Sequence, residues 1–397
     1  MIFEALLEAM TVVKNGMVCE GRENRTANRS LKLMEKITLI GSSRDSLPTP
    51  ALILDADIFE SNIKKMQSLL AAKGVSLRAH AKTHKSPAIG QIQMKAGAVG
   101  LCCATLAEAE AMVQGGLDKI LITSQIAGDD KARRLASLAA YADISIAVDC
   151  RDNIAELSQA ALACGSSVGI IVEVDVGMGR CGVRSPADAV LLAQEAVECE
   201  GLSFRGLMGY EGHAVFLGDR DVRQNTGLAA NRMLLESAEA VRSKGIPVEI
   251  VSAAGTGTYD IASEVEGITE IQAGSYIFMD LAYEKLGLPF EIALTVLSTV
   301  ISRPDQKTAV LDCGMKSISV EREMPRPLGY EGMEIFKLAE EHALARINPS
   351  MNSPLRGEKV SLIPSHCCTT VNLHDSIYLV RDRRVEAVWP ISARGIH

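Results

Sequence analysis

The chain has 397 residues, of which 47% are hydrophobic and 23% charged, as is ordinary for a globular protein with one large and one smaller domain. The formal net charge of −8, without a long basic run, argues against a nucleic-acid-binding protein. No apolar run approaches the roughly 18–20 residues that span a bilayer, so we expect no membrane segment.

The ten cysteines do not follow the spacing of a small disulfide-rich domain. Several lie within apolar runs, where a reduced cysteine behaves as a small hydrophobic residue, and this usage predicts a cytoplasmic location. Residues 1–36 lack the order of basic, apolar and small residues that marks a signal peptide, and we expect a weakly ordered N-terminal extension there.

From Thr49 onward, short apolar strands alternate with helical patterns. Ala51–Asp55 is the first predicted strand, and eight more follow it over roughly 200 residues with helical patterns between them, which favours a (β/α)8 TIM-type barrel. The runner-up is an open doubly wound sheet, but no Gly-x-Gly-x-x-Gly follows the first strand. The eight predicted barrel strands lie near Leu77–His80, Gly100–Cys103, Ile120–Thr123, Ile144–Asp149, Gly169–Asp175, Gly206–Tyr210, Glu249–Ser252 and Glu270–Gln272.

After about Gly287 the pattern becomes rich in β-strands separated by turn residues, which predicts a second, mostly antiparallel β domain. Met324–Pro354 is rich in Pro, Gly and Met, and we expect an irregular insertion there. Because Ala51–Asp55 precedes the first barrel helix, we assign it to the β domain. The predicted barrel therefore covers residues 56–286, and the β domain covers residues 37–55 and 287–397.

A basic stretch, Leu77–Lys85, begins with the first predicted barrel strand and holds two lysines, two histidines and an arginine. It is either a solvated basic turn or a site for an anion or a carbonyl cofactor. Reactive residues of such barrels lie at the carboxyl ends of the strands. Lys82 is a better candidate than Lys85 for a covalent lysine because it follows the strand more closely.

Two late turns, 253–258 and 273–276, combine glycines with threonine and serine at the ends of the last two strands. They are either ordinary tight turns or a phosphate cup, which barrels often place after their last strands. A phosphate cup with an interior lysine would suit a phosphorylated aldehyde held as a Schiff base. Arg180, after the fifth strand, either contacts the ring of such a cofactor or forms a salt bridge at the rim.

A second cluster, Pro364–Thr370, follows the predicted strand Lys359–Ile363. In an extended segment the alternation of side chains places His366 and Cys368 on one face and Cys367 on the other. An imidazole and a thiolate on one face form half of a zinc-like site. The alternative is a buried cysteine pair beside a hydrogen-bonded histidine.

Together these segments resemble the D-threonine aldolase and D-serine dehydratase family, whose members bind pyridoxal phosphate and combine an alanine racemase-like barrel with a β domain. The resemblance runs from about Leu47 to the C-terminus. The segments that carry it are Arg-Ala-His-Ala-Lys-Thr-His-Lys (78–85), Glu-Val-Asp-Val-Gly-Met-Gly-Arg-Cys-Gly (173–182), Gly-Thr-Gly-Thr (255–258), Gln-Ala-Gly-Ser-Tyr-Ile-Phe-Met-Asp (272–280) and Pro-Ser-His-Cys-Cys-Thr-Thr-Val-Asn-Leu-His-Asp (364–375).

The resemblance implies a role for each matching residue. Lys82 corresponds to the Schiff-base lysine, and His366 with Cys368 to the ligands of a divalent metal, Zn²⁺ or Mn²⁺. His80 and His213 are candidate acid/base groups beside it, with His84 a further candidate. The implied cofactor contacts are Arg180, Tyr210, Gly257, Thr258, Gly274, Ser275 and Tyr276.

The resemblance implies a homodimeric lyase that acts on a small D-3-hydroxy amino acid. Two departures from the aldolase pattern leave the reaction open. At the position of Cys368 the aldolases carry an aspartate, whereas the dehydratases carry a cysteine as this chain does. The aldolases also have a different turn at 210–213. We expect retro-aldol cleavage to glycine and an aldehyde, and the alternative is a D-serine or D-3-hydroxyaspartate dehydratase. A racemase would leave His366 and Cys368 without a task, and a non-catalytic pyridoxal phosphate carrier would need neither the metal pair nor the β domain.

Overall fold

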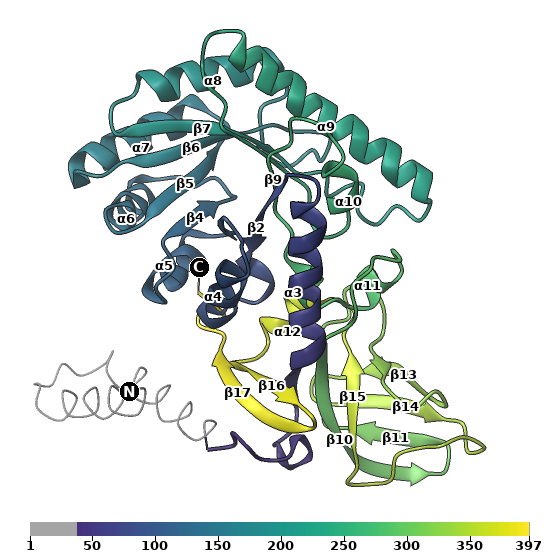
Figure 1. Ribbon diagram of the computed structural model, residues 1–397. Helices are drawn as coiled ribbons and strands as arrows, with labels where there is room; N and C mark the ends of the chain where they lie inside the picture. The colour runs from purple at the N-terminus through teal and green to yellow at the C-terminus, as the bar shows by residue number, and fades with distance from the viewer. Residues whose placement is uncertain (1–37, 397) are drawn as a thin grey trace, which may run out of the picture.

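The computed structural model describes residues 38–396, which form a closed parallel barrel and a separate sheet (Figure 1). The predicted extension at residues 1–36 lies outside the described residues. The barrel strands run in sequence order: β2 (Ser76–His80), β3 (Gly100–Cys103), β4 (Lys119–Ile122), β5 (Asp143–Val148), β6 (Val168–Glu173), β7 (Leu202–Gly209), β8 (Ile250–Ala253) and β9 (Glu270–Ile271). The predicted (β/α)8 barrel is confirmed.

Helices cover the outside of the barrel, and several begin at a side-chain cap. Asp55 accepts a hydrogen bond from the Ile58 N–H at the start of the first helix, and Thr105 and Ser185 cap two others in the same way. The helices are α3 (Ala56–Ala71), α4 (Pro87–Lys95), α5 (Leu106–Gln114), α6 (Asp129–Ala139), α7 (Arg151–Cys164), α8 (Pro186–Glu198), α9 (Arg220–Arg242), α10 (Tyr259–Ala262), α11 (Leu281–Glu284) and α12 (Cys367–Val371).

The barrel strands read as nearly continuous apolar runs because both of their faces are buried, as in β3 and β6. Inside the barrel, one side chain from each of five successive strands forms a packed layer. A packed interior leaves only the rim of the barrel free to form a site. The layer consists of Cys102, Leu121, Ala147, Ile171 and Met208.

The second sheet is antiparallel apart from one pair, β1 (Ala51–Asp55) with β16 (Ser376–Arg381). The strand β1 thus lies in this sheet, and α3 leads from it into the barrel (Figure 1). The proposed domain limits at 56 and 287 stay a prediction. The other strands are β10 (Leu294–Asp305), β11 (Thr308–Leu311), β12 (Arg326–Pro327), β13 (Met333–Leu338), β14 (Ala343–Ile347), β15 (Lys359–Ile363) and β17 (Arg384–Pro390).

The expectation of an irregular insertion over Met324–Pro354 is wrong, because this segment holds β12, β13 and β14. The strands β13 and β14 pair antiparallel and bury alternate side chains, including Ile335 and Ala345. The content of Pro, Gly and Met obscured this alternation of period two.

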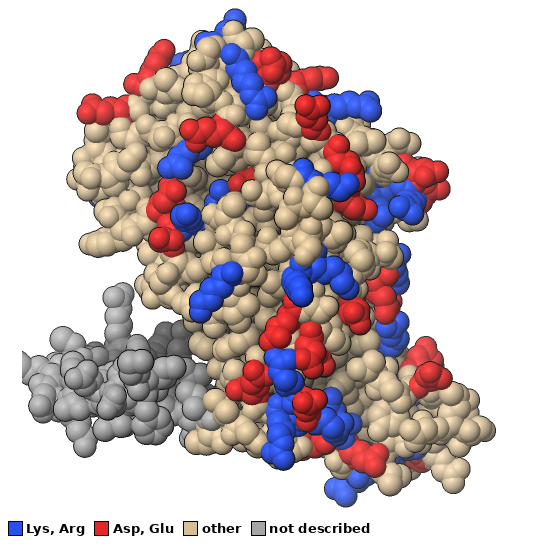
Figure 2. Space-filling view, viewed as in Figure 1, with Lys and Arg blue, Asp and Glu red and all other residues tan. Residues whose placement is uncertain are grey.

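Charged side chains of both signs are intermixed on the face drawn in Figure 2. Among residues 38–396, no helix is long and apolar enough to cross a membrane.

The barrel closes through a buried ion pair between its first and last strands. Arg78 on β2 donates from Nε and Nη2 to Glu270 on β9, at 2.8 and 2.9 Å, and the two side chains are only 13% and 5% exposed. Removal of one partner leaves a buried charge without compensation.

We predict that Glu270→Ala lowers the free energy of unfolding by about 3–5 kcal/mol, because Arg78 stays buried and unpaired. The matched control is Glu264→Ala, which breaks an exposed pair with Lys73 and should cost less than about 1 kcal/mol. Urea titrations followed by circular dichroism measure both losses. Equal losses would show that the Arg78–Glu270 pair does not hold the barrel closed.

Candidate active site

A cavity of about 310 Å³ lies where the carboxyl ends of the barrel strands meet loops of the second sheet. The barrel supplies most of its wall, as the topology predicts. The predicted site residues that line it are His80, Lys82, Arg180, Tyr210, Gly274, Ser275, His366 and Cys368. Other residues of its wall are Thr83, Thr123, Gly255, Thr256, Gln272, Tyr283 and Arg322.

Lys82 enters this cavity from the short turn Ala81–Thr83 that follows β2. Its Nζ lies 5.8 Å from the centroid of the Tyr210 ring, and it forms no ion pair within residues 38–396. Lys85, the alternative, is ion-paired to Glu108 at 2.5 Å and does not line the cavity. Lys82 is therefore the lysine free to react.

The three candidate histidines of the barrel differ in their surroundings. His80 lines the cavity, with Nε2 3.3 Å from the Thr123 hydroxyl, and burial together with the nearby Lys82 charge holds its pKa well below the ordinary value. His84 is buried outside the cavity lining, and burial lowers its pKa to about 4. His213 is exposed and lies outside the cavity lining. Of these three histidines, only His80 can contact a molecule in the cavity, and its lowered pKa keeps the imidazole neutral.

The two glycine-bearing turns form a cradle of backbone donors. The N–H groups of Thr256, Gly257, Gly274 and Ser275 have no acceptor within the described chain. The Tyr276 N–H donates to the Thr256 hydroxyl at 3.0 Å and so joins one turn to the other. Buried N–H groups without partners are rare unless a ligand or water satisfies them, so this cradle fits a phosphate.

Small residues are required where these turns meet the lysine segment. A Cβ at Gly274 would lie 2.4 Å from the Thr83 hydroxyl, so a larger residue would close the cradle against it. Three other predicted contacts lie outside the cavity lining. They are Gly257, Thr258 and Tyr276, whose buried hydroxyl accepts a hydrogen bond from Gln93.

Arg180 forms the ion pair at the rim that was one of its two predicted roles, and its contact with a cofactor ring stays a prediction. It lines the cavity, and its Nη2 lies 3.5 Å from Glu173, whose other oxygen accepts a hydrogen bond from Gln125 at 2.6 Å. The carboxylate orients the guanidinium across the rim while leaving it half-exposed and able to contact a bound ring.

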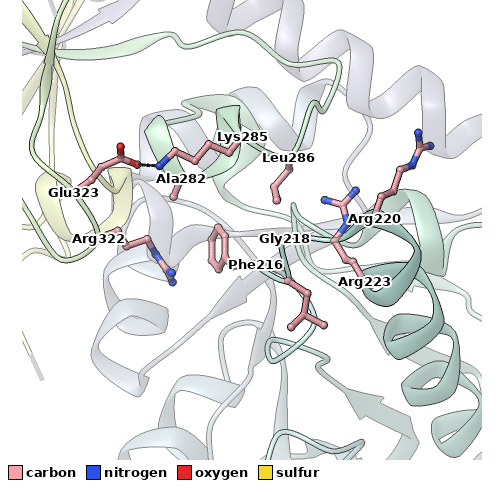
Figure 3. Close-up of a pocket in the computed structure, with 10 residues that line it drawn as sticks. Phe216, Gly218, Arg220, Arg223, Ala282, Lys285, Leu286, Arg322 and Glu323 are labelled. Carbon is pink, nitrogen blue, oxygen red and sulfur yellow. Dashed lines mark hydrogen bonds and ion pairs between the residues drawn. The ribbon is translucent and has the colours of Figure 1, made fainter.

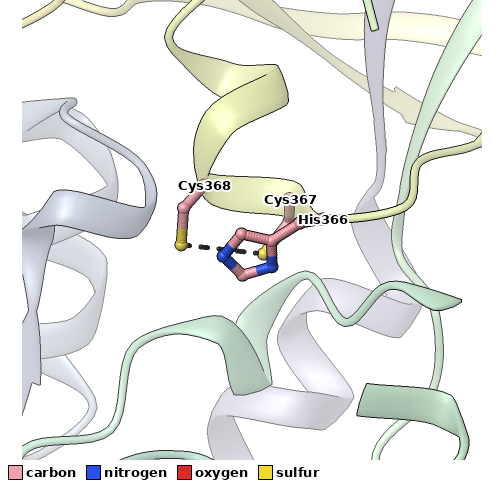
Figure 4. A group of neighbouring side chains, drawn as sticks. All are labelled: His366, Cys367 and Cys368. Carbon is pink, nitrogen blue, oxygen red and sulfur yellow. Dashed lines mark hydrogen bonds between the residues drawn. The ribbon is translucent and has the colours of Figure 1, made fainter. Parts of the chain in front are cut away.

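His366, Cys367 and Cys368 place their ligand atoms within 4.8 Å of one another (Figure 4). The expectation of an extended segment is wrong, since only His366 is extended and α12 begins at Cys367. The turn of the helix still separates the thiols, because Cys367 is fully buried whereas Cys368 lines the cavity beside His366. Imidazole with thiolate is a donor set that suits zinc.

Asp280 fixes the orientation of His366. Its Oδ2 lies 2.8 Å from His366 Nδ1 and also accepts the Cys367 N–H at 2.8 Å. This leaves Nε2 of the imidazole as the atom available to a metal, an arrangement common among metal-binding histidines. Burial opposes a charge on His366, but the hydrogen bonds to Asp280 and Cys368 outweigh it and raise its pKa to about 10.

Several site residues were not predicted from the sequence. Thr83 and Thr256 lie inside recognised motifs and could have been named from them. Asp280 ends the 272–280 motif, but its bond to a histidine 86 positions away leaves no trace in local spacing. Tyr283 and Arg322 come from segments without any motif, and only the fold brings them to the cavity.

Comparisons with known proteins show what the chain is similar to. Residues 54–282 match the family model "Alanine racemase, N-terminal domain", and residues 293–380 match a model of the serine dehydratase domain. A D-threonine aldolase from Arthrobacter sp. is 40% identical over 87% of this chain and 93% of its own length. A 3-hydroxy-D-aspartate aldolase from Paracoccus denitrificans is 36% identical, over 90% and 95%.

A D-threo-3-hydroxyaspartate dehydratase from Delftia sp. is 29% identical, over 82% of this chain and 92% of its own length. The crystal structure of a D-threonine aldolase from Filomicrobium marinum superposes with a TM-score of 0.87 at 37% identity, and the match covers 90% of this chain and 98% of that one. The chain is thus similar to both aldolases and a dehydratase.

A buried carboxyl lies behind the phosphate cradle. Glu211 is 1% exposed, and its Oε2 accepts the Ala254 N–H at 3.3 Å, while Oε1 has no partner within the described chain. Burial raises its pKa from 4.5 to about 7, although hydrogen bonds from Thr258 and Ala254 partly oppose this. The folded protein therefore keeps a proton that the unfolded chain loses.

We predict that Glu211 contributes a fall in stability as the pH rises from about 5 to about 8, because the folded state binds the Glu211 proton more tightly than the unfolded state does. The lowered pKa values of His80 and His84 act in the opposite sense, so the fall is measured as the difference between wild type and Glu211→Gln. The contribution lost is on the order of 3 kcal/mol. In Glu211→Gln this fall should be absent, while the exposed control Glu264→Gln should keep it. Urea unfolding at both pH values measures the difference, and an equal fall in wild type and Glu211→Gln would contradict the assignment.

Proposed function

The chain belongs to the alanine racemase-like family that includes D-threonine aldolases and D-serine dehydratases, and we propose that it cleaves D-3-hydroxy amino acids to glycine and an aldehyde. The main observation in support of this proposal is that Lys82 and the His366–Cys368 pair line one cavity. The family implies pyridoxal phosphate, and the proposal adds a divalent metal, Zn²⁺ or Mn²⁺. The two aldolases with 40% and 36% identity favour aldol cleavage over elimination.

Residues that follow several different barrel strands would hold the cofactor. Lys82 would form the covalent link, the turns at 255–258 and 274–275 would bind the phosphate, and Arg180 with Tyr210 would contact the ring. When bound, pyridoxal phosphate supplies an electron sink for the bonds at the substrate's Cα. As a neutral imidazole, His80 can accept a proton but cannot donate one as an imidazolium.

His366 and Cys368 would hold the metal, which supplies Lewis acidity toward the substrate's β-oxygen. Asp280 orients His366 for this role, and Thr83, whose hydroxyl lies 3.4 Å from Cys368 Sγ, positions the thiol. The pair thereby marks the end of the cavity that takes the β-carbon of the substrate. The resemblance also implies a homodimer, and we include it in the proposal.

Elimination to a 2-oxo acid and ammonia is the second candidate, and the thiol of Cys368 favours it, since the resembling aldolases carry an aspartate there. The same cavity could serve either reaction, because both begin from the same bound substrate.

Incubation of the Zn²⁺- or Mn²⁺-loaded holoenzyme with D-threonine separates the two reactions. We expect acetaldehyde and glycine in equal amounts, measured by alcohol dehydrogenase coupling and by amino acid chromatography. 2-Oxobutanoate with ammonia would establish the dehydratase instead. Turnover of no D-3-hydroxy amino acid would favour a carrier of the cofactor.

We predict that borohydride reduction attaches the cofactor to Lys82, because this lysine is free in the cavity whereas Lys85 is paired with Glu108. Mass spectrometry of tryptic peptides measures the label. Lys82→Arg should lose it, and the matched control Lys85→Arg should keep it. A label that survives Lys82→Arg and disappears in Lys85→Arg would reverse the assignment.

A further inference from the structure

A second cavity, of about 410 Å³, adjoins the cavity that Lys82 lines. Figure 3 draws residues that line this second cavity. Phe216 and Arg322 line both cavities and so form their common wall. The Arg322 guanidinium stacks on the Phe216 ring with its Cζ 3.8 Å from the ring centroid. The rest of the wall comes from the start of α9, from α11 and from the turn after it.

The second cavity carries an excess of positive charge. Four cationic side chains line it and a single carboxylate, Glu323, which is ion-paired with Lys285 at 2.6 Å. The other three cations are Arg220, Arg223 and Arg322, and none of them forms an ion pair within residues 38–396. Arg223 is 5% exposed and its Nε has no acceptor there. A buried cation without a partner is costly, so this cavity is suited to an anion.

The position of Arg322 relates this charge to the substrate. The N–H groups of Arg322 and Glu323 both donate to the Ser365 hydroxyl at 3.1 Å. Ser365 directly precedes His366, so the hydrogen bonds hold Arg322 beside the metal-binding pair. The substituent on the substrate's β-carbon would extend from the metal-binding pair toward this arginine.

We propose that Arg322 is a specificity-determining residue that binds a carboxylate on the β-substituent of the substrate. This inference rests on the proposed function and narrows it to D-3-hydroxy amino acids with a second acidic group, the 3-hydroxyaspartate class. Arg220 and Arg223 add positive potential behind that carboxylate and attract a substrate that carries a net negative charge. The methyl group of D-threonine offers nothing to pair with the guanidinium.

Steady-state kinetics with D-3-hydroxyaspartate and D-threonine test this proposal. The wild type should show the higher kcat/KM for 3-hydroxyaspartate. Arg322→Gln should lower the ratio of the two kcat/KM values by about tenfold, mainly through KM for the acidic substrate, because a charge-assisted hydrogen bond is lost. Arg322→Lys should retain part of the ratio. The control Arg326→Gln, which breaks an exposed pair with Glu284, should leave the ratio unchanged.

Binding of succinate to the holoenzyme, measured by calorimetry, gives a readout that does not depend on turnover. We expect succinate to bind the wild type about tenfold more tightly than Arg322→Gln. If neither amino acid is cleaved but succinate binding still depends on Arg322, the proposed function fails and the anion site stands. An unchanged kcat/KM ratio in Arg322→Gln would overturn the specificity role. The specificity role would also be overturned if succinate did not bind and Arg322→Gln changed the oligomeric state. That result would mean that a second copy of the chain covers the cavity.

Discussion

The carboxylate of Asp280 joins the two halves of the site. It follows the last barrel strand, is fully buried, and accepts hydrogen bonds from three donors, the His366 imidazole and the backbone N–H groups of Cys367 and Tyr283. The Leu281 N–H adds a bond to the Pro364 carbonyl. These contacts fix a loop of the second sheet over the mouth of the barrel. Without them the imidazole and thiol would not face Lys82 at a defined distance.

This arrangement assigns different electrostatic tasks to different sides of the cavity. The barrel side holds a neutral histidine, His80, and a cradle of unpartnered backbone N–H groups. The side of the second sheet holds the imidazole–thiol pair and, next to it, Arg322. Arg322 adds a positive charge at the β-substituent end of the proposed substrate, besides those of Lys82 and Arg180 on the barrel side. This charge would orient a substrate that carries an acid at that end.

The barrel and most of its site could be predicted from the sequence because strand order fixes which residues share a rim. Lys82 and the glycine turns each follow a barrel strand, and parallel strands bring such residues to one rim. The His366–Cys368 pair follows β15 of the antiparallel sheet and was identified from its own motif. His213 also follows a strand, yet it is exposed, since a turn can direct its side chain outward. Local pattern does not encode that direction.

Other features depend on contacts between distant segments. Asp280 and Arg322 act through Cys367, His366 and Ser365, and no spacing rule connects them. The strands β13 and β14 escaped prediction because turn-forming residues surround two short alternating runs. The start of α12 at Cys367 escaped it because two cysteines and two threonines have no marked helical preference. In each case tertiary packing decides the local structure.

The central claim is that one cavity holds both the cofactor-linked lysine and the metal. A crystal structure of the holoenzyme soaked with Zn²⁺ tests it most directly, with the electron-density map showing the cofactor and an anomalous difference map locating the zinc. We expect density continuous with Lys82 Nζ and a zinc peak bound by His366 Nε2 and Cys368 Sγ, about 2.0–2.3 Å from each. A zinc peak away from these two residues, or cofactor density joined to another side chain, would contradict the account.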